Sequence, residues 1–145
     1  MSGLTSPQQK LQRQIDCQLE VNAHAALSAW ESAGWNEEPG TDSDEGPLKY
    51  IALILLEAIE EKAIRITMDK DSEPTVYGDV TYTLPKAPSS YIARGLEILR
   101  EIAGMEGSHA RGSIVLGVRN DSIELILQKD GGRHTLTMPG LGLTG

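Results

Sequence analysis

Apolar residues between positions 48 and 68 follow a helical period first and an alternating period afterwards. One helical face carries Leu48, Ile51, Ala52, Leu55, Ile59 and Ala63, with Leu56 on its flank. The acidic residues Glu57, Glu60 and Glu61 lie together opposite this face. Every second residue from Ile64 to Met68 is then apolar. The pattern predicts a helix that passes, with no Gly or Pro break, into a half-buried strand.

The rest of this body repeats the order of a helix followed by strands. Residues 69–74 predict a turn and residues 76–84 alternate again, so a hairpin is expected there. A second apolar helical face begins after Pro88 and stops at Gly104. Three further strands, joined by tight turns, are predicted at 113–118, 122–128 and 133–138. The order predicts an α+β domain: a mostly antiparallel sheet of about five strands with helices packed on one face.

A long helix is predicted ahead of this body. Ser6 and Pro7 form a start signal and Gly34 a stop signal, which gives a helix of roughly 25 residues. Its apolar stripe is narrow and is interrupted by Asn22, so the helix must dock on something to be stable. It docks either on its own domain or on a partner protein or second copy, as in a homodimer. The candidate partner-binding residues are Leu11, Ile15, Leu19, Trp30 and Trp35.

The predicted domain organisation follows from these segments. Residues 1–36 hold the N-terminal helix, and residues 37–47 form an acidic linker rich in turn formers. Residues 48–140 form the α+β domain, and residues 141–145 form a flexible tail. The G-x-G-x-x-G pattern at residues 140–145 lacks the following helix that a dinucleotide site requires.

Charge and cysteine content narrow the environment and the partners. The net charge is −8, and residues 1–47 alone hold 8 acidic and 2 basic side chains. No basic stripe is present, which argues against nucleic acid as a partner. Cys17 is the single cysteine and cannot form an internal disulfide, as expected in a reducing compartment. With neither a signal peptide nor a membrane-spanning apolar run, the chain is expected to be cytoplasmic and not inserted in a membrane.

The sequence offers no catalytic, cofactor-binding or metal-binding signature. The acidic clusters that begin at Asp42 and Asp69 lack the Gly and Glu that an EF-hand requires at its sixth and twelfth positions. The three histidines have no partner at metal-ligand spacing, and Cys17 has no evident base. We therefore predict no catalytic residue, no cofactor and no metal, and a protein that is not an enzyme.

Two segments of the body resemble a known domain family. The helix at 93–105, reading ARGLEILREIAGM, is similar to an S-R-L-K-x-L-A-G-M type helix, and residues 63–67 keep the apolar spacing of an A-S-D-I-H block. These two motifs are typical of the small PAS-like α+β domain that precedes the motor domain of type II secretion and type IV pilus assembly ATPases, and this chain resembles that domain in both places. The chain has Ile64, Arg65 and Thr67 where that block has Ser, Asp and His. The resemblance covers roughly residues 48–140 and implies a stand-alone, non-catalytic module without the ATPase domain.

Two functions are expected from these observations. The first is a protein-interaction or adaptor module, linked through the resemblance to a secretion or pilus-type machinery. The alternative is a regulatory sensor domain that holds a small ligand between helix and sheet. In that case Arg65, Arg94 and Arg119 are the candidate contacts to an anionic group of the ligand.

Overall fold

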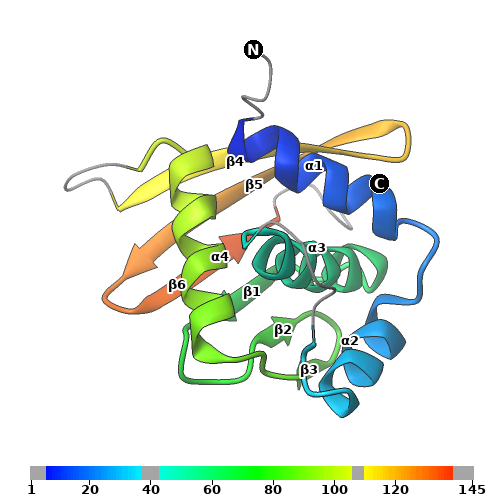
Figure 1. Ribbon diagram of the computed structural model, residues 1–145. Helices are drawn as coiled ribbons and strands as arrows, with labels where there is room; N and C mark the ends of the chain where they lie inside the picture. The colour runs from blue at the N-terminus through cyan, green and yellow to red at the C-terminus, as the bar shows by residue number, and fades with distance from the viewer. Residues whose placement is uncertain (1–5, 37–42, 106–109, 139–145) are drawn as a thin grey trace.

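The computed structural model describes residues 6–36, 43–105 and 110–138. Within these ranges the chain has an α+β fold with four helices and one antiparallel sheet of six strands, in the order β3-β2-β1-β6-β5-β4 (Figure 1). The helices are α1 (Pro7–Gln18), α2 (Ala23–Ser32), α3 (Glu45–Glu60) and α4 (Ser89–Ile102). The strands are β1 (Arg65–Met68), β2 (Thr75–Tyr77), β3 (Thr81–Thr83), β4 (Arg111–Val118), β5 (Asp121–Asp130) and β6 (Arg133–Thr137).

The α+β class is confirmed, but the sheet has six strands where about five were expected. The single strand predicted at 76–84 is wrong, because Tyr77 pairs with Thr81 and residues 78–80 form a turn between β2 and β3. The apolar alternation runs through this turn and hides it. Val80 falls on the apolar period, yet it is 69% exposed at the turn. The three later strands were predicted correctly as neighbours, with β5 between β4 and β6.

The prediction of one long N-terminal helix is also wrong. The chain forms α1 and α2, separated by a turn that ends at Asn22. The Asn22 side chain accepts a hydrogen bond from the Ala25 backbone N–H at 2.9 Å and caps α2. Asn is among the strongest N-cap residues, because its short side chain satisfies an N–H group that has no partner inside the helix. The interruption of the apolar stripe is therefore the start of a second helix.

Both N-terminal helices dock on their own domain, which decides between the alternatives left open by the sequence. Helix α1 packs on α3, α4 and β4, and α2 packs on α3. Two glutamines of α1 reach the exposed edge of β4: Gln12 accepts from the Gly117 N–H at 2.9 Å and donates to its carbonyl at 2.7 Å. Gln8 donates to the Val115 carbonyl at 2.9 Å. These side chains occupy backbone groups of an edge strand that would otherwise be open to pairing with another chain.

Helix α3 is central among the helices, because α1, α2 and α4 all pack on it. Every residue from Gly46 to Ala58 is buried except Lys49, which is half-buried, as expected for a helix that is apolar nearly all round. Glu45 to Pro47, the last part of the expected acidic linker, form its first turn. Linker residues 37–42 and the predicted tail at 141–145 lie outside the described ranges.

Candidate functional site

The five side chains predicted to bind a partner lie against the chain's own body. Leu11 and Ile15 are fully buried, Trp30 is 9% exposed, and Leu19 and Trp35 are partly buried against the core. Burial against the chain's own body is one of the two kinds of docking that the sequence left open, and the partner-binding role of these five residues stays a prediction. These five side chains contribute to stability by packing in the interior of the domain.

The two tryptophans belong to an aromatic cluster that fastens α2 to the domain. The Trp30 ring lies 5.2 Å from that of Trp35 and 5.9 Å from that of Tyr91, and Trp35 meets Tyr50 edge-on at 5.6 Å. The Tyr91 hydroxyl also donates to the Trp35 carbonyl at 3.2 Å. Such tilted and edge-on pairs are favourable ring geometries. Their signal in the sequence, two tryptophans near a helix end, is the same for a packing role and for an interface.

The three arginines proposed as ligand contacts do not converge. The Arg65 guanidinium lies over the Tyr77 ring at 4.2 Å. Arg94 joins α4 to the start of α3 through two hydrogen bonds to Asp44, at 2.8 and 3.0 Å. The hydrogen bond from Arg94 holds the pKa of the Asp44 carboxyl below its usual value. Arg94 is thus a structural link between two helices, and the predicted set does not form one anion site.

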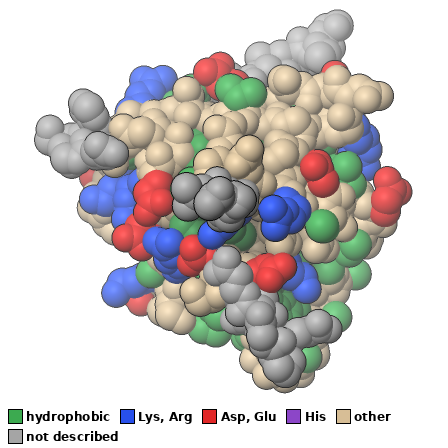
Figure 2. All heavy atoms as spheres, turned by 45° about the horizontal axis from the view of Figure 1, so that its top comes forward, with side chains coloured by type: hydrophobic (Ala, Val, Ile, Leu, Met, Phe, Trp, Pro, Cys, Tyr) green, Lys and Arg blue, Asp and Glu red, His purple; other side chains and the backbone are tan. Residues whose placement is uncertain are grey.

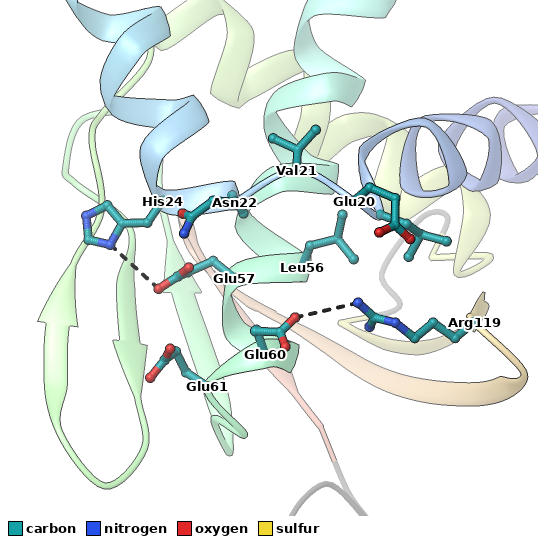
Figure 3. A pocket seen from close by; sticks show the side chains of 11 residues that line it. Glu20, Val21, Asn22, His24, Leu56, Glu57, Glu60, Glu61 and Arg119 are labelled. Carbon is teal, nitrogen blue, oxygen red and sulfur yellow. Dashed lines mark ion pairs between the residues drawn. The ribbon is translucent and has the colours of Figure 1, made fainter.

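Arg119 instead lies at a different kind of site, a hollow of about 580 Å³ between the α1–α2 turn, the end of α3 and the β4–β5 turn (Figure 3). We call it the acidic hollow. It is lined by Leu19, Glu20, Val21, Asn22, Ala23, His24, Leu56, Glu57, Glu60, Glu61 and Arg119. Figure 3 shows Glu57, Glu60 and Glu61 at the C-terminal end of α3, with His24 at one end of the hollow and Arg119 at the other. Four carboxylates, those of Glu20 and these three residues, thus line the hollow together with a single guanidinium.

Glu57 is the most buried carboxylate of the acidic hollow. Its side chain is 10% exposed, and its Oε2 atom accepts a hydrogen bond from the Tyr82 hydroxyl at 2.6 Å. The same oxygen lies 3.7 Å from His24 Nδ1, and the His24 ring stacks on Tyr82. Burial, and then the bond to Glu57, raise the pKa of the Tyr82 hydroxyl, so Tyr82 stays protonated and donates. The Tyr82 hydroxyl thus holds the Glu57 side chain in place within the acidic hollow.

The remaining carboxylates create a negative potential that the local structure does not cancel. The last turn of α3 carries no basic residue, and a helix C-terminus itself bears a partial negative charge. Glu60 is 69% exposed, and its contact with Arg119, at 4.0 Å, is a weak surface pair. Among the described residues, no three His, Cys, Asp or Glu side chains are grouped closely enough to hold a metal ion. The acidic hollow therefore presents exposed carboxylates beside the negative end of α3.

Part of the acidic hollow could be predicted from the sequence. The helical period places Glu57, Glu60 and Glu61 together, but it assigns all three to the solvated side of the helix. Glu57 is buried because α2 and β3 bring His24 and Tyr82 against it. Neither contact has a local signal, since the partners lie 33 and 25 residues away in the chain.

The molecular surface adds two observations about partners. On the face shown in Figure 2, basic and acidic side chains are interspersed, and no basic stripe crosses it. In the part of the chain that the structure describes, no helix combines the length and the hydropathy needed to cross a membrane.

No protein-family model matches the chain, and no curated protein matches it in sequence. The relationship to the secretion and pilus ATPase domain stays a prediction from the pattern of residues. The acidic hollow is therefore argued from its own geometry.

Proposed function

We propose that the chain is a non-enzymatic protein-binding module whose acidic hollow receives a lysine or arginine side chain of a partner protein. The observation that carries the proposal is that four carboxylates, together with the negative end of α3, line a hollow of about 580 Å³. The partner contact thus moves from the N-terminal apolar stripe to this hollow.

Size and charge both support a basic side chain as the ligand. The volume lies in the ~300–1,000 Å³ range of pockets that bury a drug-sized ligand, so a side chain and its flanking backbone fit. A guanidinium can bind a carboxylate through two parallel hydrogen bonds, and Glu60 and Glu61 are exposed and adjacent. Arg119 competes only weakly, because an exposed ion pair contributes about 0–1 kcal/mol.

The resemblance noted in the sequence suggests where to look for the partner. If the body is a stand-alone relative of the domain that precedes secretion and pilus ATPases, its partners are components of such a machinery. A basic segment on one of those components is the ligand to test first.

The proposal is tested by nuclear magnetic resonance titration of the full-length protein with N-acetyl-arginine amide and N-acetyl-lysine amide. The expected result is saturable shifts in the backbone amides of Asn22, His24 and Arg119. N-acetyl-citrulline amide has nearly the shape of the arginine probe without its charge, and it should cause no such shifts. The double variant Glu60→Gln/Glu61→Gln should lose the response.

A matched control is provided by two carboxylates outside the acidic hollow. The variant Glu73→Gln/Glu124→Gln removes the same charge from exposed positions on the β1–β2 turn and on β5. It should bind the probes as the unmodified protein does. Equal loss in both double variants, or equal shifts with citrulline, would show that only the overall negative charge attracts the probes and would overturn the proposal.

A further inference from the structure

A second hollow, of about 190 Å³, lies at the opposite end of the sheet and has the opposite charge. We call it the basic hollow; it is lined by Lys70, Ala93, Leu96, Arg100, Lys129, Gly131, Gly132 and His134. Its residues come from the β1–β2 turn, α4, the end of β5, the β5–β6 turn and the start of β6. Strand β5 separates the two hollows, and its 10 residues span about 30 Å.

The cations of the basic hollow have no carboxylate partner in the part of the chain that the structure describes. Within residues 6–36, 43–105 and 110–138, neither Lys70 nor Arg100 nor Lys129 forms an ion pair. The nearby Asp69 carboxylate accepts a hydrogen bond from the Asp71 backbone N–H at 2.8 Å, within its own turn. Three positive side chains therefore share one small hollow without a counter-charge among the described residues.

His134 fixes the guanidinium of Arg100 in this position. Arg100 Nη1 lies 2.7 Å from His134 Nε2, and the histidine is 4% exposed. An arginine can only donate, so Nε2 must be the unprotonated acceptor, and the proton sits on Nδ1, which faces the Gly132 carbonyl at 3.3 Å. Burial, and then the charge of Arg100, lower the pKa of His134, so the ring stays neutral at physiological pH. A neutral partner orients Arg100 without neutralising it.

The strand pattern shows that this arrangement departs from a simple core. His134 and Leu136 occupy the buried side of β6, and Lys129 lies directly across from His134 on β5. Leu125 and Leu127 are the buried residues that precede Lys129 on the same side of β5. A lysine and a histidine thus extend an inward-facing apolar row at the point where the helix layer ends.

We infer that the basic hollow is a binding site for a small dianion, a phosphate or the phosphate group of a small phosphomonoester. Arg100 provides a fixed fork of donors, and the two lysines add mobile positive charge. The hollow is smaller than the ~300–1,000 Å³ pockets of drug-sized ligands, so it accommodates one compact anionic group. A side chain built at Gly131 or Gly132 would meet nothing within 4 Å, so that group can enter past the turn.

This inference is independent of the proposed function, because it concerns other residues and a ligand of the opposite charge. The test is a titration of full-length protein with inorganic phosphate, glycerol 2-phosphate, acetate and chloride at constant ionic strength, which holds screening fixed. Backbone amides of Leu96, Gly131 and Gly132 are expected to shift and saturate with phosphate. Tighter binding of glycerol 2-phosphate would identify a phosphomonoester as the ligand, and binding of inorganic phosphate alone would identify free phosphate.

Surface variants keep the test separate from folding. Lys70→Gln and Lys129→Gln, both at exposed positions, should each weaken phosphate binding about tenfold, the factor that corresponds to one charge-assisted hydrogen bond. Lys62→Gln makes the same charge change at the end of α3 and should leave binding unchanged. Equal responses to phosphate and chloride, or equal weakening by Lys62→Gln, would overturn the inference.

Discussion

The docking of α1 on its own domain predicts a large stability loss for Leu11→Ala. Leu11 lies on α1 and is fully buried in the core. Helix α1 packs on α3, although more than 25 residues separate the two helices in the chain. Replacing a buried Leu by Ala removes transfer free energy and leaves a cavity, at a cost of about 3 kcal/mol. Unfolding entropy of about 2.1 cal/mol/K per residue gives about 0.3 kcal/mol/K for 145 residues, so the midpoint should fall by about 10 °C.

Thermal and urea unfolding followed by circular dichroism measure this loss. The transition should remain single, because α1 packs on α3, α4 and β4 and unfolds together with them. Val21→Ala is the control: Val21 lies in the α1–α2 turn and is 43% exposed, so its substitution should change the free energy of unfolding by no more than about 0.5 kcal/mol.

The opposite result has a clear meaning. A Leu11→Ala protein with unchanged stability but an altered mass in light scattering would falsify the docking described for α1. It would return that helix to the role of an interface with a partner or a second copy. An unchanged mass with the expected loss of stability supports the observed fold.

Three further predictions follow from particular contacts. Gly95→Ala places a Cβ 2.6 Å from Ile51 Cγ1. The substitution should lower the free energy of unfolding in urea by about 1–2 kcal/mol, although Ala has the better helix propensity. In an Ile51→Ala background this added loss should vanish. Gln12→Leu removes both hydrogen bonds to Gly117, and we expect a loss of about 1–2 kcal/mol with faster hydrogen exchange of the Gly117 amide; unchanged exchange would argue against capping of the β4 edge. The pKa of His134 in the folded protein lies below its usual 6.5, so the unfolded chain binds more protons than the folded protein as the pH falls below about 6.5. The free energy of unfolding should therefore decrease there by at most about 1.4 kcal/mol per pH unit. His134→Gln should remove that part of the pH dependence of urea unfolding, and an identical dependence in both proteins would contradict it.

The helix and strand pattern of the body could be predicted because its signals are local. The stop at Gly104 is an example: the residue has a φ of 72°, a conformation that glycine adopts without steric cost. The end of α3 had no such signal, because Lys62 takes a φ of 56° in place of a glycine. The turn at 78–80 was missed because an apolar period continues across it, and the α1–α2 break was missed because Asn22 resembled a flaw in a stripe.

The candidate sites were less predictable than the fold. Arg65, Arg94 and Arg119 were chosen as free positive charges, but each is engaged by a neighbour that the sequence does not place beside it. The cations that do converge, Lys70 and Arg100 among them, lie on elements with no common pattern. One available signal was overlooked: Lys129 continues the buried side of a strand whose earlier residues are leucines.

The sequence by itself determined the α+β class and the order of most elements, because periods of 3.6 and 2 residues reflect the geometry of single elements. Tertiary structure alone decided that α1 and α2 cover α3, that Glu57 is buried beside Tyr82, and that the two ends of the sheet carry hollows of opposite charge. These features depend on contacts between segments far apart in the chain. Burial and charge at such contacts are set by which surfaces pack together, and no local period of the sequence encodes that choice.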